Sequence, residues 1–368
     1  MIPVLQPHAN QKIIDEMTKV LKSGWWGQGP ITKQAEEAFA EYVGAKYAIG
    51  CNSGTAALDL CLKAYNIEGG ELITTPMTFV ADAIVGEWNG MEVVFNDIDA
   101  SSLCLDPNTL KVNDETKAII AVDSHGRLAD IQGIREKAKR ELNGVGYTCP
   151  LIIEDAAHAM FTPGAGKYAD ITMWSFQAVK SLPSGDGGMI TTNDEKIYKK
   201  LRTLTWLGVE KSTYDRAGKA AYSWDYDITQ SDGTKSYMND LTAVIVLNQL
   251  PRLEEMTGKR RAIQARYNEA FSGMRKNIKI PMYSHTVQYY TMKCKNRNQL
   301  SDYLAKKGIA TSVHFKPLYE MTYWKKAKKH PLPVCDRVWK KLLTLPVFYN
   351  LKWEQVEYII KSVKEFYV

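Results

Sequence analysis

Short apolar runs recur along the first half of the chain, and longer stretches separate them. The runs are YAIGC at 47–51, ELITTP at 71–76, MEVVFND at 91–97, KAIIAVD at 117–123, LIIED at 151–155, ITMWSF at 171–176 and GGMITT at 187–192. Runs of four to seven residues with helical segments between them are typical of buried, mostly parallel strands. The pattern therefore predicts an α/β domain with three layers, α/β/α.

Helical spacing is clearest on both sides of this alternation. Ile13, Met17 and Val20 recur with a helical period before Gly24, and a second amphipathic helix should follow the loop at 24–30. Residues 241–271 are predicted to form one long helix that is interrupted near Pro251, because proline lacks the N–H that a helix interior needs. We expect residues 1–250 to form a large domain with N-terminal helices, and residues 251–368 a smaller C-terminal α+β domain.

A polar, aromatic segment at 209–232 breaks the pattern. It is longer than most connections in compact domains, which indicates a functional or partner-facing loop. Its aromatic residues, which we expect to shape the choice of substrate, are Tyr214, Tyr222, Trp224 and Tyr226.

Composition and charge narrow the classes of function. The chain has 368 residues, 45% hydrophobic and 24% charged, as in globular proteins. Its net charge of +6 comes from short, scattered basic clusters, which does not favour nucleic-acid binding. We find no signal segment and no apolar run long enough to span a bilayer. Six cysteines without a C-x-x-C pair fit neither a metal site nor a disulfide framework. We therefore expect a cytoplasmic protein with free thiols, no metal and no membrane contact.

Small polar residues follow the first strand, in the segment NSGTAAL at 52–58. The hydroxyls of Ser53 and Thr55, the backbone N–H groups around Gly54 and the helix dipole suit a phosphate group. A simple helix N-cap is the alternative reading.

Asp155 and Lys180 follow two later strands. Asp155 could be a helix cap, a metal ligand, a ribose contact or the partner of a protonated pyridine nitrogen. Lys180 has the apolar neighbours Val179 and Leu182, and such surroundings lower the pKa of a lysine and prepare its amine to attack a carbonyl. A surface lysine is the alternative. A candidate phosphate site at 52–58, an aspartate and this lysine in one α/β domain indicate a pyridoxal phosphate enzyme.

Over nearly its whole length the chain resembles the DegT-type sugar aminotransferases, a family of fold-type I, aspartate-aminotransferase-like enzymes that use pyridoxal 5′-phosphate. The segments that carry the resemblance are GWWGQGP at 24–30, NSGTAAL at 52–58, TPMTFVAD at 75–82, IEDAAHA at 153–159, SFQAVKSLPSGDGGMITTND at 175–194, MNDLTA at 238–243 and GIATSVHFKPLY at 308–319. They occur in the order that the family shows.

The resemblance implies a role for several residues. Lys180 would bond to the cofactor aldehyde and move protons between cofactor and substrate, and Asp155 would pair with the ring nitrogen. His158 would lie near the ring oxygen and Phe79 would stack on the ring. The remaining cofactor contacts implied within one chain are Ser53, Gly54, Thr55, Ser175 and Gln177.

The family is dimeric, and a loop of each subunit completes the site of the other. Lys235 in GTKSYM at 233–238 matches one version of that loop, while Tyr237 stands where asparagine is expected. Lys235 is therefore the expected contact to the phosphate of the neighbouring subunit. A second departure is DSHG at 123–126, where relatives carry histidine at position 123, so His125 is expected to be a core or capping residue.

For the substrate, the resemblance points to His314 and Lys316, with Trp26 from the first loop. His314 and Lys316 would alternate along a strand, point the same way and meet a diphosphate. Two unrelated polar residues on a surface strand are the alternative.

The implied reaction moves an amino group from an amino acid, most simply L-glutamate, to a keto-sugar linked to a nucleotide, with pyridoxamine 5′-phosphate as the intermediate form of the cofactor. A keto-cyclitol substrate and a non-catalytic regulatory protein of the same fold stay open. A sugar dehydratase is disfavoured, since those relatives replace the lysine with histidine.

Overall fold

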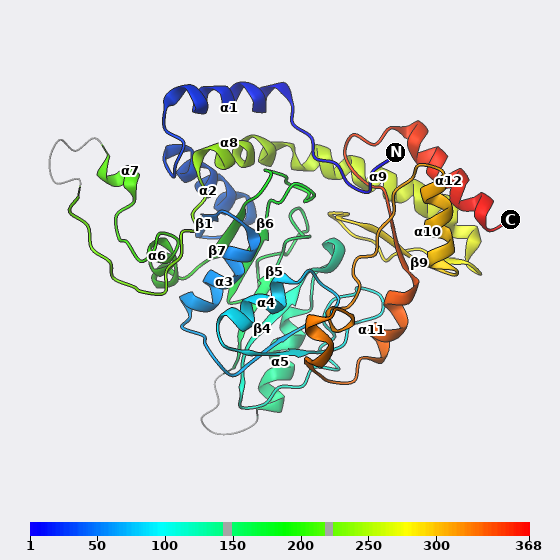
Figure 1. Cartoon of the computed structure of the whole chain (residues 1–368), viewed down its shortest axis with the longest axis horizontal. Coiled ribbons are helices and arrows are strands. Elements are labelled where there is room, and N and C mark those ends of the chain that lie inside the picture. The colour runs from blue at the N-terminus through cyan, green and yellow to red at the C-terminus, as the bar shows by residue number, and fades with distance from the viewer. Residues whose placement is uncertain (143–148, 218–223) are drawn as a thin grey trace.

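The computed structural model describes residues 1–142, 149–217 and 224–368, and a large mixed sheet forms its centre (Figure 1). The strand order is β1-β7-β6-β5-β4-β2-β3-β10. Their bounds are β1 Tyr47–Cys51, β2 Glu71–Thr74, β3 Glu92–Phe95, β4 Thr116–Val122, β5 Leu151–Asp155, β6 Ile171–Ser175, β7 Gly188–Thr192 and β10 Lys328–Lys329. All seven predicted strands are present, and only β7 runs antiparallel to its neighbours β1 and β6. The mostly parallel sheet is confirmed.

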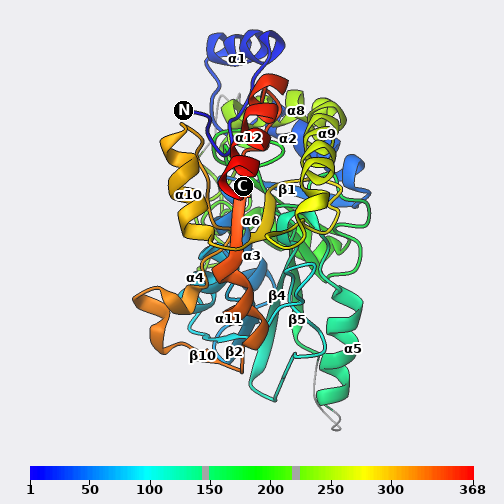
Figure 2. The ribbon, with the colours of Figure 1, turned by 90° about the vertical axis from the view of Figure 1, so that its right-hand side faces the viewer.

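Helices cover both faces of this sheet, as the alternation of apolar side chains in β4 requires. Ile120 and Val122 belong to one core with α3, α4 and α6, whereas Ile119 and Ala121 belong to another core with α5. Figure 2 shows α4 and α5 on opposite sides. The helices of this part are α1 Gln11–Ser23, α2 Pro30–Val43, α3 Gly54–Ala64, α4 Ala81–Trp88, α5 Ile131–Glu141, α6 Glu195–Leu204, α7 Thr213–Arg216 and α8 Asp240–Gln249. The predicted three layers are confirmed.

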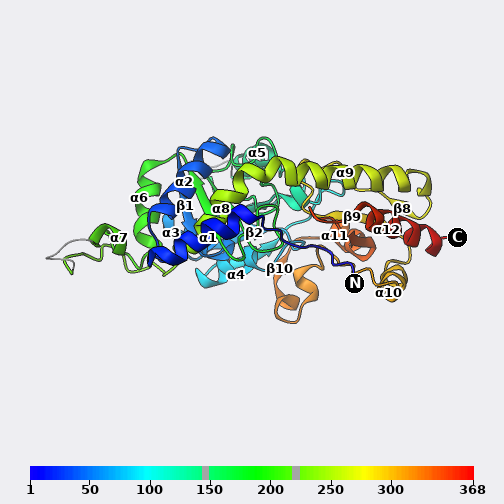
Figure 3. The same ribbon diagram turned by 90° about the horizontal axis from the view of Figure 1, so that it is seen from above.

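The long helix predicted around Pro251 is two helices in line. α8 ends at Gln249, a short 3-10 turn spans Leu250–Arg252, and α9 runs from Leu253 to Phe271. Figures 1 and 3 show α8 and α9 leading from the large sheet to the C-terminal elements.

A second, antiparallel sheet lies at that end, in the order β11-β9-β8. It shares a separate apolar core with α9, α10 and α12, and Ile2 from the N-terminus joins this core. The bounds are β8 Ile278–Lys279, β9 Tyr290–Cys294, β11 Leu342–Leu345, α10 Arg297–Lys306, α11 Pro333–Val338 and α12 Trp353–Phe366. Between these elements, apolar side chains from Leu318 to Val338 pack into the core of the large sheet, and β10 pairs with β3. The division at residues 250 and 251 stays a prediction.

In the described part of the aromatic segment, α7 lies away from the large sheet (Figure 3). Tyr214 packs edge-on against Trp25, while Trp224 is 72% exposed. Tyr222 lies outside the described residues. None of the helices in the described part of the chain is long and apolar enough to cross a membrane.

Candidate active site

Lys180 lies in the turn between β6 and β7, beside the carboxyl end of β5. Its backbone N–H donates to the carbonyl of Gln177 at 2.8 Å, which closes a tight turn. Asp155, the last residue of β5, is buried, and one of its oxygens accepts from the N–H of Ala157 at 2.8 Å. Adjacent β-strands end at the same edge of the sheet, so the two side chains meet although 25 positions separate them in sequence numbering (180 − 155 = 25).

A third ionisable group joins them. Asp82 in the first turn of α4 is buried, accepts from the Thr78 hydroxyl at 2.6 Å, and lies within hydrogen-bonding reach of Asp155. Burial lowers the pKa of Lys180, and the carboxylates of Asp155 and Asp82 oppose that shift. Burial raises the pKa of Asp155, while the charge of Lys180 opposes this effect. The pKa of Lys180 thus moves in the direction that its apolar neighbours predict.

The turn after β1 approaches β6 and β7 closely. Ser53 is the N-cap of α3, where its hydroxyl oxygen accepts from the N–H of Ala56 at 3.1 Å. A Cβ atom on Gly54 would lie 3.0 Å from Cβ of Ser175, and one on Gly188 would lie 2.7 Å from the carbonyl oxygen of Ser53. The two glycines therefore let the start of α3 lie against Ser175. The first N–H groups of a helix have no partner within it, so this end can receive an anion.

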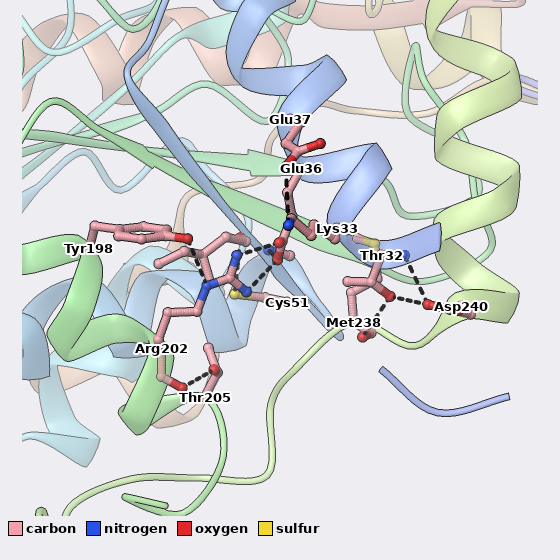
Figure 4. A network of polar contacts seen from close by, with 12 residues as sticks. Thr32, Lys33, Glu36, Glu37, Cys51, Tyr198, Arg202, Thr205, Met238 and Asp240 are labelled. Carbon is pink, nitrogen blue, oxygen red and sulfur yellow. Dashed lines mark hydrogen bonds and ion pairs between the residues drawn. The ribbon is translucent and has the colours of Figure 1, made fainter. Parts of the chain in front are cut away.

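Buried ion pairing fixes β1 behind this turn, as Figure 4 shows. Arg202 of α6 donates to both carboxylate oxygens of Glu36 in α2, and Glu36 also accepts from the N–H of Gly50 at 2.7 Å. Asp240 at the start of α8 accepts from the hydroxyl of Thr32 in α2 at 2.6 Å. These contacts hold helices α2, α6 and α8 to β1, the strand that leads into the turn before α3.

Lys235 comes close to this turn through its backbone. The Asn52 side chain donates to the carbonyl of Lys235 at 3.3 Å, and the Asn52 N–H donates to the carbonyl of Ser236 at 2.7 Å. The amine of Lys235 lies over the ring of Trp206, 5.5 Å from its centre. Tyr237 packs edge-on against the same ring. A single chain thus places Lys235 at the margin of the turn, with an exposed side chain.

Three histidines gather beside Lys180. His158 is buried and stacks on the ring of Phe315, and His125 lies next to it with 0% exposure. His314 is half-buried, stacks on Tyr289 with 3.7 Å between ring centres, and shares a hydrogen bond with Thr344 at 2.9 Å. Burial and the charge of Lys180 lower the pKa of His158 well below its usual value and that of His314 to about 3. His125 is the core histidine that the sequence predicts, yet it also contacts the cluster.

The expected strand through His314 and Lys316 is not present. Residues 314 and 315 form a turn, with His314 half-buried and Lys316 exposed. The prediction that both side chains point the same way from a strand is therefore wrong, because alternation applies only to extended backbone. Trp26, also named as a substrate residue, is 52% exposed, and its indole N–H donates to the carbonyl of Leu21 at 3.1 Å.

Asp82 is the residue near Lys180 that sequence reasoning missed. It lies inside the quoted segment TPMTFVAD, but an acidic residue in the first turn of a helix is ordinary. A second buried carboxyl pair consists of Asp123, directly after β4, and Glu154 in the neighbouring strand β5, and burial raises the pKa of both groups. Asp123 stands at the position where histidine was expected.

These residues fit a pyridoxal phosphate group. The amine of Lys180 can meet an aldehyde, the Asp155 carboxyl a ring nitrogen, and the start of α3 a phosphate. Among the described residues, Nε2 of His158 and Oδ1 of Asp82 are buried without a hydrogen-bond partner. Phe79 is 61% exposed just before α4, and Gln177 is exposed beside Lys180. Within the described ranges no group of three or more His, Cys, Asp or Glu side chains could hold a metal ion.

Comparison with known proteins gives consistent matches along the chain. The sequence profile of the DegT/DnrJ/EryC1/StrS aminotransferase family matches residues 7–364. The spore coat polysaccharide biosynthesis protein SpsC of Bacillus subtilis (strain 168) is 35% identical over 384 residues, which cover 99% of this chain and 96% of SpsC.

Solved structures of sugar aminotransferases also match the chain over nearly its whole length. Spr1654 of Streptococcus pneumoniae, provisionally described as a sugar aminotransferase, matches with a TM-score of 0.89 and 29% identity in its PMP form, covering 99% of this chain and 98% of that one. Its PLP form matches with a TM-score of 0.88. The sugar aminotransferase CalS13 of Micromonospora echinospora has a TM-score of 0.88 and 27% identity, covering 99% and 100%.

Proposed function

The chain belongs to the DegT/DnrJ/EryC1/StrS aminotransferase family and is an enzyme that depends on pyridoxal phosphate, and we propose that it aminates a keto-sugar carried on a nucleotide, with L-glutamate as the donor. The product would be an amino-deoxy sugar nucleotide. The name of SpsC connects that relative with polysaccharide biosynthesis, which supports a role for this enzyme in making amino sugars for a polysaccharide.

The observation that carries this proposal is the juxtaposition of Lys180 with Asp155 at the carboxyl edge of the sheet. When bound, pyridoxal phosphate supplies an electron sink and stores the amino group, in its pyridoxamine form, between the two half-reactions. Lys180 acts as the acid and base that moves a proton at the substrate carbon, since burial lowers the pKa of its amine. The Asp155 carboxyl would pair with the ring nitrogen of the cofactor.

The other residues bind and orient. The start of α3, with Ser53, Gly54 and Thr55, would hold the phosphate together with Ser175. His158 has a buried, unpartnered Nε2 that can meet the ring oxygen. Phe79 has an exposed ring that can cover one face of the cofactor, and Gln177 would border Lys180.

For the sugar nucleotide we propose His314, Lys316 and Trp26. Burial and the charge of Lys180 lower the pKa of His314, and this proximity to Lys180 supports a position for its ring near the substrate. The exposed cation of Lys316, two residues on, can meet a diphosphate further out. The donor and the sugar would use this pocket in turn.

We further propose a homodimer with shared sites, in the cytoplasm. Large apolar side chains are exposed on α1, just before α4 and in the aromatic segment; they include Ile14, Leu21, Phe79, Trp224 and Ile228. A partner subunit would cover them and bring its Lys235 to the phosphate. The six cysteines are free, as a reducing compartment requires.

The test is the Lys180→Ala variant, assayed with a panel of keto-sugar nucleotides and L-glutamate for 2-oxoglutarate. We expect loss of turnover and of the visible absorbance of the bound cofactor. Lys276→Ala, at an exposed lysine of the C-terminal elements, is the control and should behave as the native enzyme. Turnover retained by Lys180→Ala would refute the assignment.

A further inference from the structure

Gln288 of the C-terminal part forms hydrogen bonds to the residues on both sides of Lys180. Its amide nitrogen donates to the carbonyl of Val179 at 2.8 Å. Its amide oxygen accepts from the hydroxyl of Ser181 at 3.0 Å. One side chain thus holds the residue before Lys180 and the residue after it.

This contact is buried and closed to water. Gln288 is 0% exposed and Ser181 is 3% exposed. A buried primary amide is costly unless its polar atoms find partners, and both of these partners flank the same lysine. Arg260 of α9 adds a third contact, since its guanidinium donates to the Ser181 hydroxyl at 3.3 Å. Ser181 therefore has fixed partners on two sides.

The same segment also contacts the histidines. Tyr289, the next residue, stacks on His314 and packs edge-on against His158. The segment that ends in β9 therefore touches the Lys180 turn through Gln288 and the expected substrate side through Tyr289.

We propose that Gln288 is a positioning residue for Lys180, and that it sets the direction of the lysine amine from the C-terminal part of the chain. This rests on the proposed role of Lys180 as the residue that bonds to the cofactor. Residues 178–184 lie in a turn outside the helices and strands, and the contacts from Gln288 help to hold that turn in one conformation. A small displacement of a reacting group is enough to lower a rate by about a hundredfold.

The experiment compares two isosteric variants of the full-length enzyme. Gln288→Met keeps the volume of the side chain and removes both hydrogen bonds. Gln249→Met is the matched control, because Gln249 is 1% exposed, donates to the carbonyl of His8 at 2.6 Å and accepts from Arg252 at 2.8 Å, away from Lys180. Each variant loses two hydrogen bonds of a buried glutamine side chain, so both should lose stability.

Only Gln288→Met should change the chemistry of Lys180. We expect covalent attachment of pyridoxal phosphate to the cofactor-free protein, followed by its visible absorbance, to be about tenfold to a hundredfold slower. We expect kcat to fall by a similar factor with little change in KM. Gln249→Met should keep the native attachment rate and kcat.

Ser181→Ala is a smaller change, which we expect to leave the fold intact. It removes one of the two flanking bonds, so its effect on attachment should be intermediate. In the double variant Ser181→Ala/Gln288→Met, the fold-reduction in the attachment rate should be smaller than the product of the two single fold-reductions. The reason is that the two residues act through one contact. Native attachment and kcat in folded Gln288→Met, or equal losses in Gln249→Met, would overturn the proposal. Turnover retained in Lys180→Ala would instead overturn the proposed function, whatever the Gln288 variants show.

Discussion

The carboxyl groups of Asp82 and Asp155 lie within hydrogen-bonding reach of each other in the core, with 1% and 6% exposure. Burial and the charge of Asp155 raise the pKa of Asp82 well above its usual value, while Lys180 and the Thr78 hydroxyl oppose that shift. Two carboxylates at such a distance do not both ionise readily. Burial next to Asp155 therefore favours the protonated form of Asp82 in the folded protein.

This pair makes the stability of the cofactor-free protein depend on pH. The folded state keeps the proton of Asp82, while the unfolded chain releases it above about pH 4. The contribution is largest below that pH and is lost as the pH rises towards the folded-state pKa, by up to about 1.4 kcal/mol per pH unit. Asp82→Asn should remove this slope. Urea unfolding at several pH values measures it, and identical slopes in variant and native protein would contradict a protonated Asp82.

The buried histidines have the opposite effect at acid pH. Burial lowers the pKa of His125, His158 and His314, so they stay neutral when folded and gain protons when unfolded. Stability should fall as the pH drops below about 6.5, by about 1.4 kcal/mol per pH unit for each histidine. His314→Gln should lower the limiting slope of the free energy of unfolding against pH by the contribution of one histidine, about 1.4 kcal/mol per pH unit. A slope unchanged in that variant would mean that His314 is charged in the folded protein.

Glu36 is expected to stabilise the fold rather than take part in the reaction. Its carboxylate is buried between Arg202 and the N–H of Gly50. Glu36→Ala leaves the guanidinium without its carboxylate partner, which should lower the free energy of unfolding by about 3 kcal/mol. The neighbouring exposed pair Lys33–Glu37 offers a control, and Glu37→Ala should give no measurable change. Chemical denaturation of the three proteins side by side decides this, and a similar small change in both variants would argue against a structural role for Glu36.

Mixing two impaired variants tests whether Lys235 acts across the dimer. Lys235→Ala should weaken cofactor binding by removing a phosphate contact, and Lys180→Ala removes the reacting amine. If Lys235 serves the partner's site, a mixed dimer of the two variants contains one site with both native lysines. Activity should then rise on mixing and subunit exchange. No rise in a sample shown by mass to contain mixed dimers would place Lys235 in its own subunit's site.

The sequence alone determined the sheet and the edge at which chemistry occurs. Seven apolar runs gave seven strands, because buried parallel strands need side chains that are apolar on both faces. Parallel strands end at one edge, so Asp155 and Lys180 could be brought together from their positions after two strands. The motifs around them also sufficed to identify the family.

Only the tertiary structure decided which residues distant in sequence pack around Asp155 and Lys180 at the carboxyl edge of the sheet. Gln288 bonds to Ser181 across 107 positions and Asp240 to Thr32 across 208, and no periodicity relates such residues. Asp82 looks like an ordinary first-turn acid until packing brings it to Asp155, and His314 and Lys316 looked like strand neighbours until the chain turned between them. Local pattern fixes which face of an element is apolar. The partner of a buried polar group depends on how separate elements pack, because each must find a hydrogen bond where packing has excluded water.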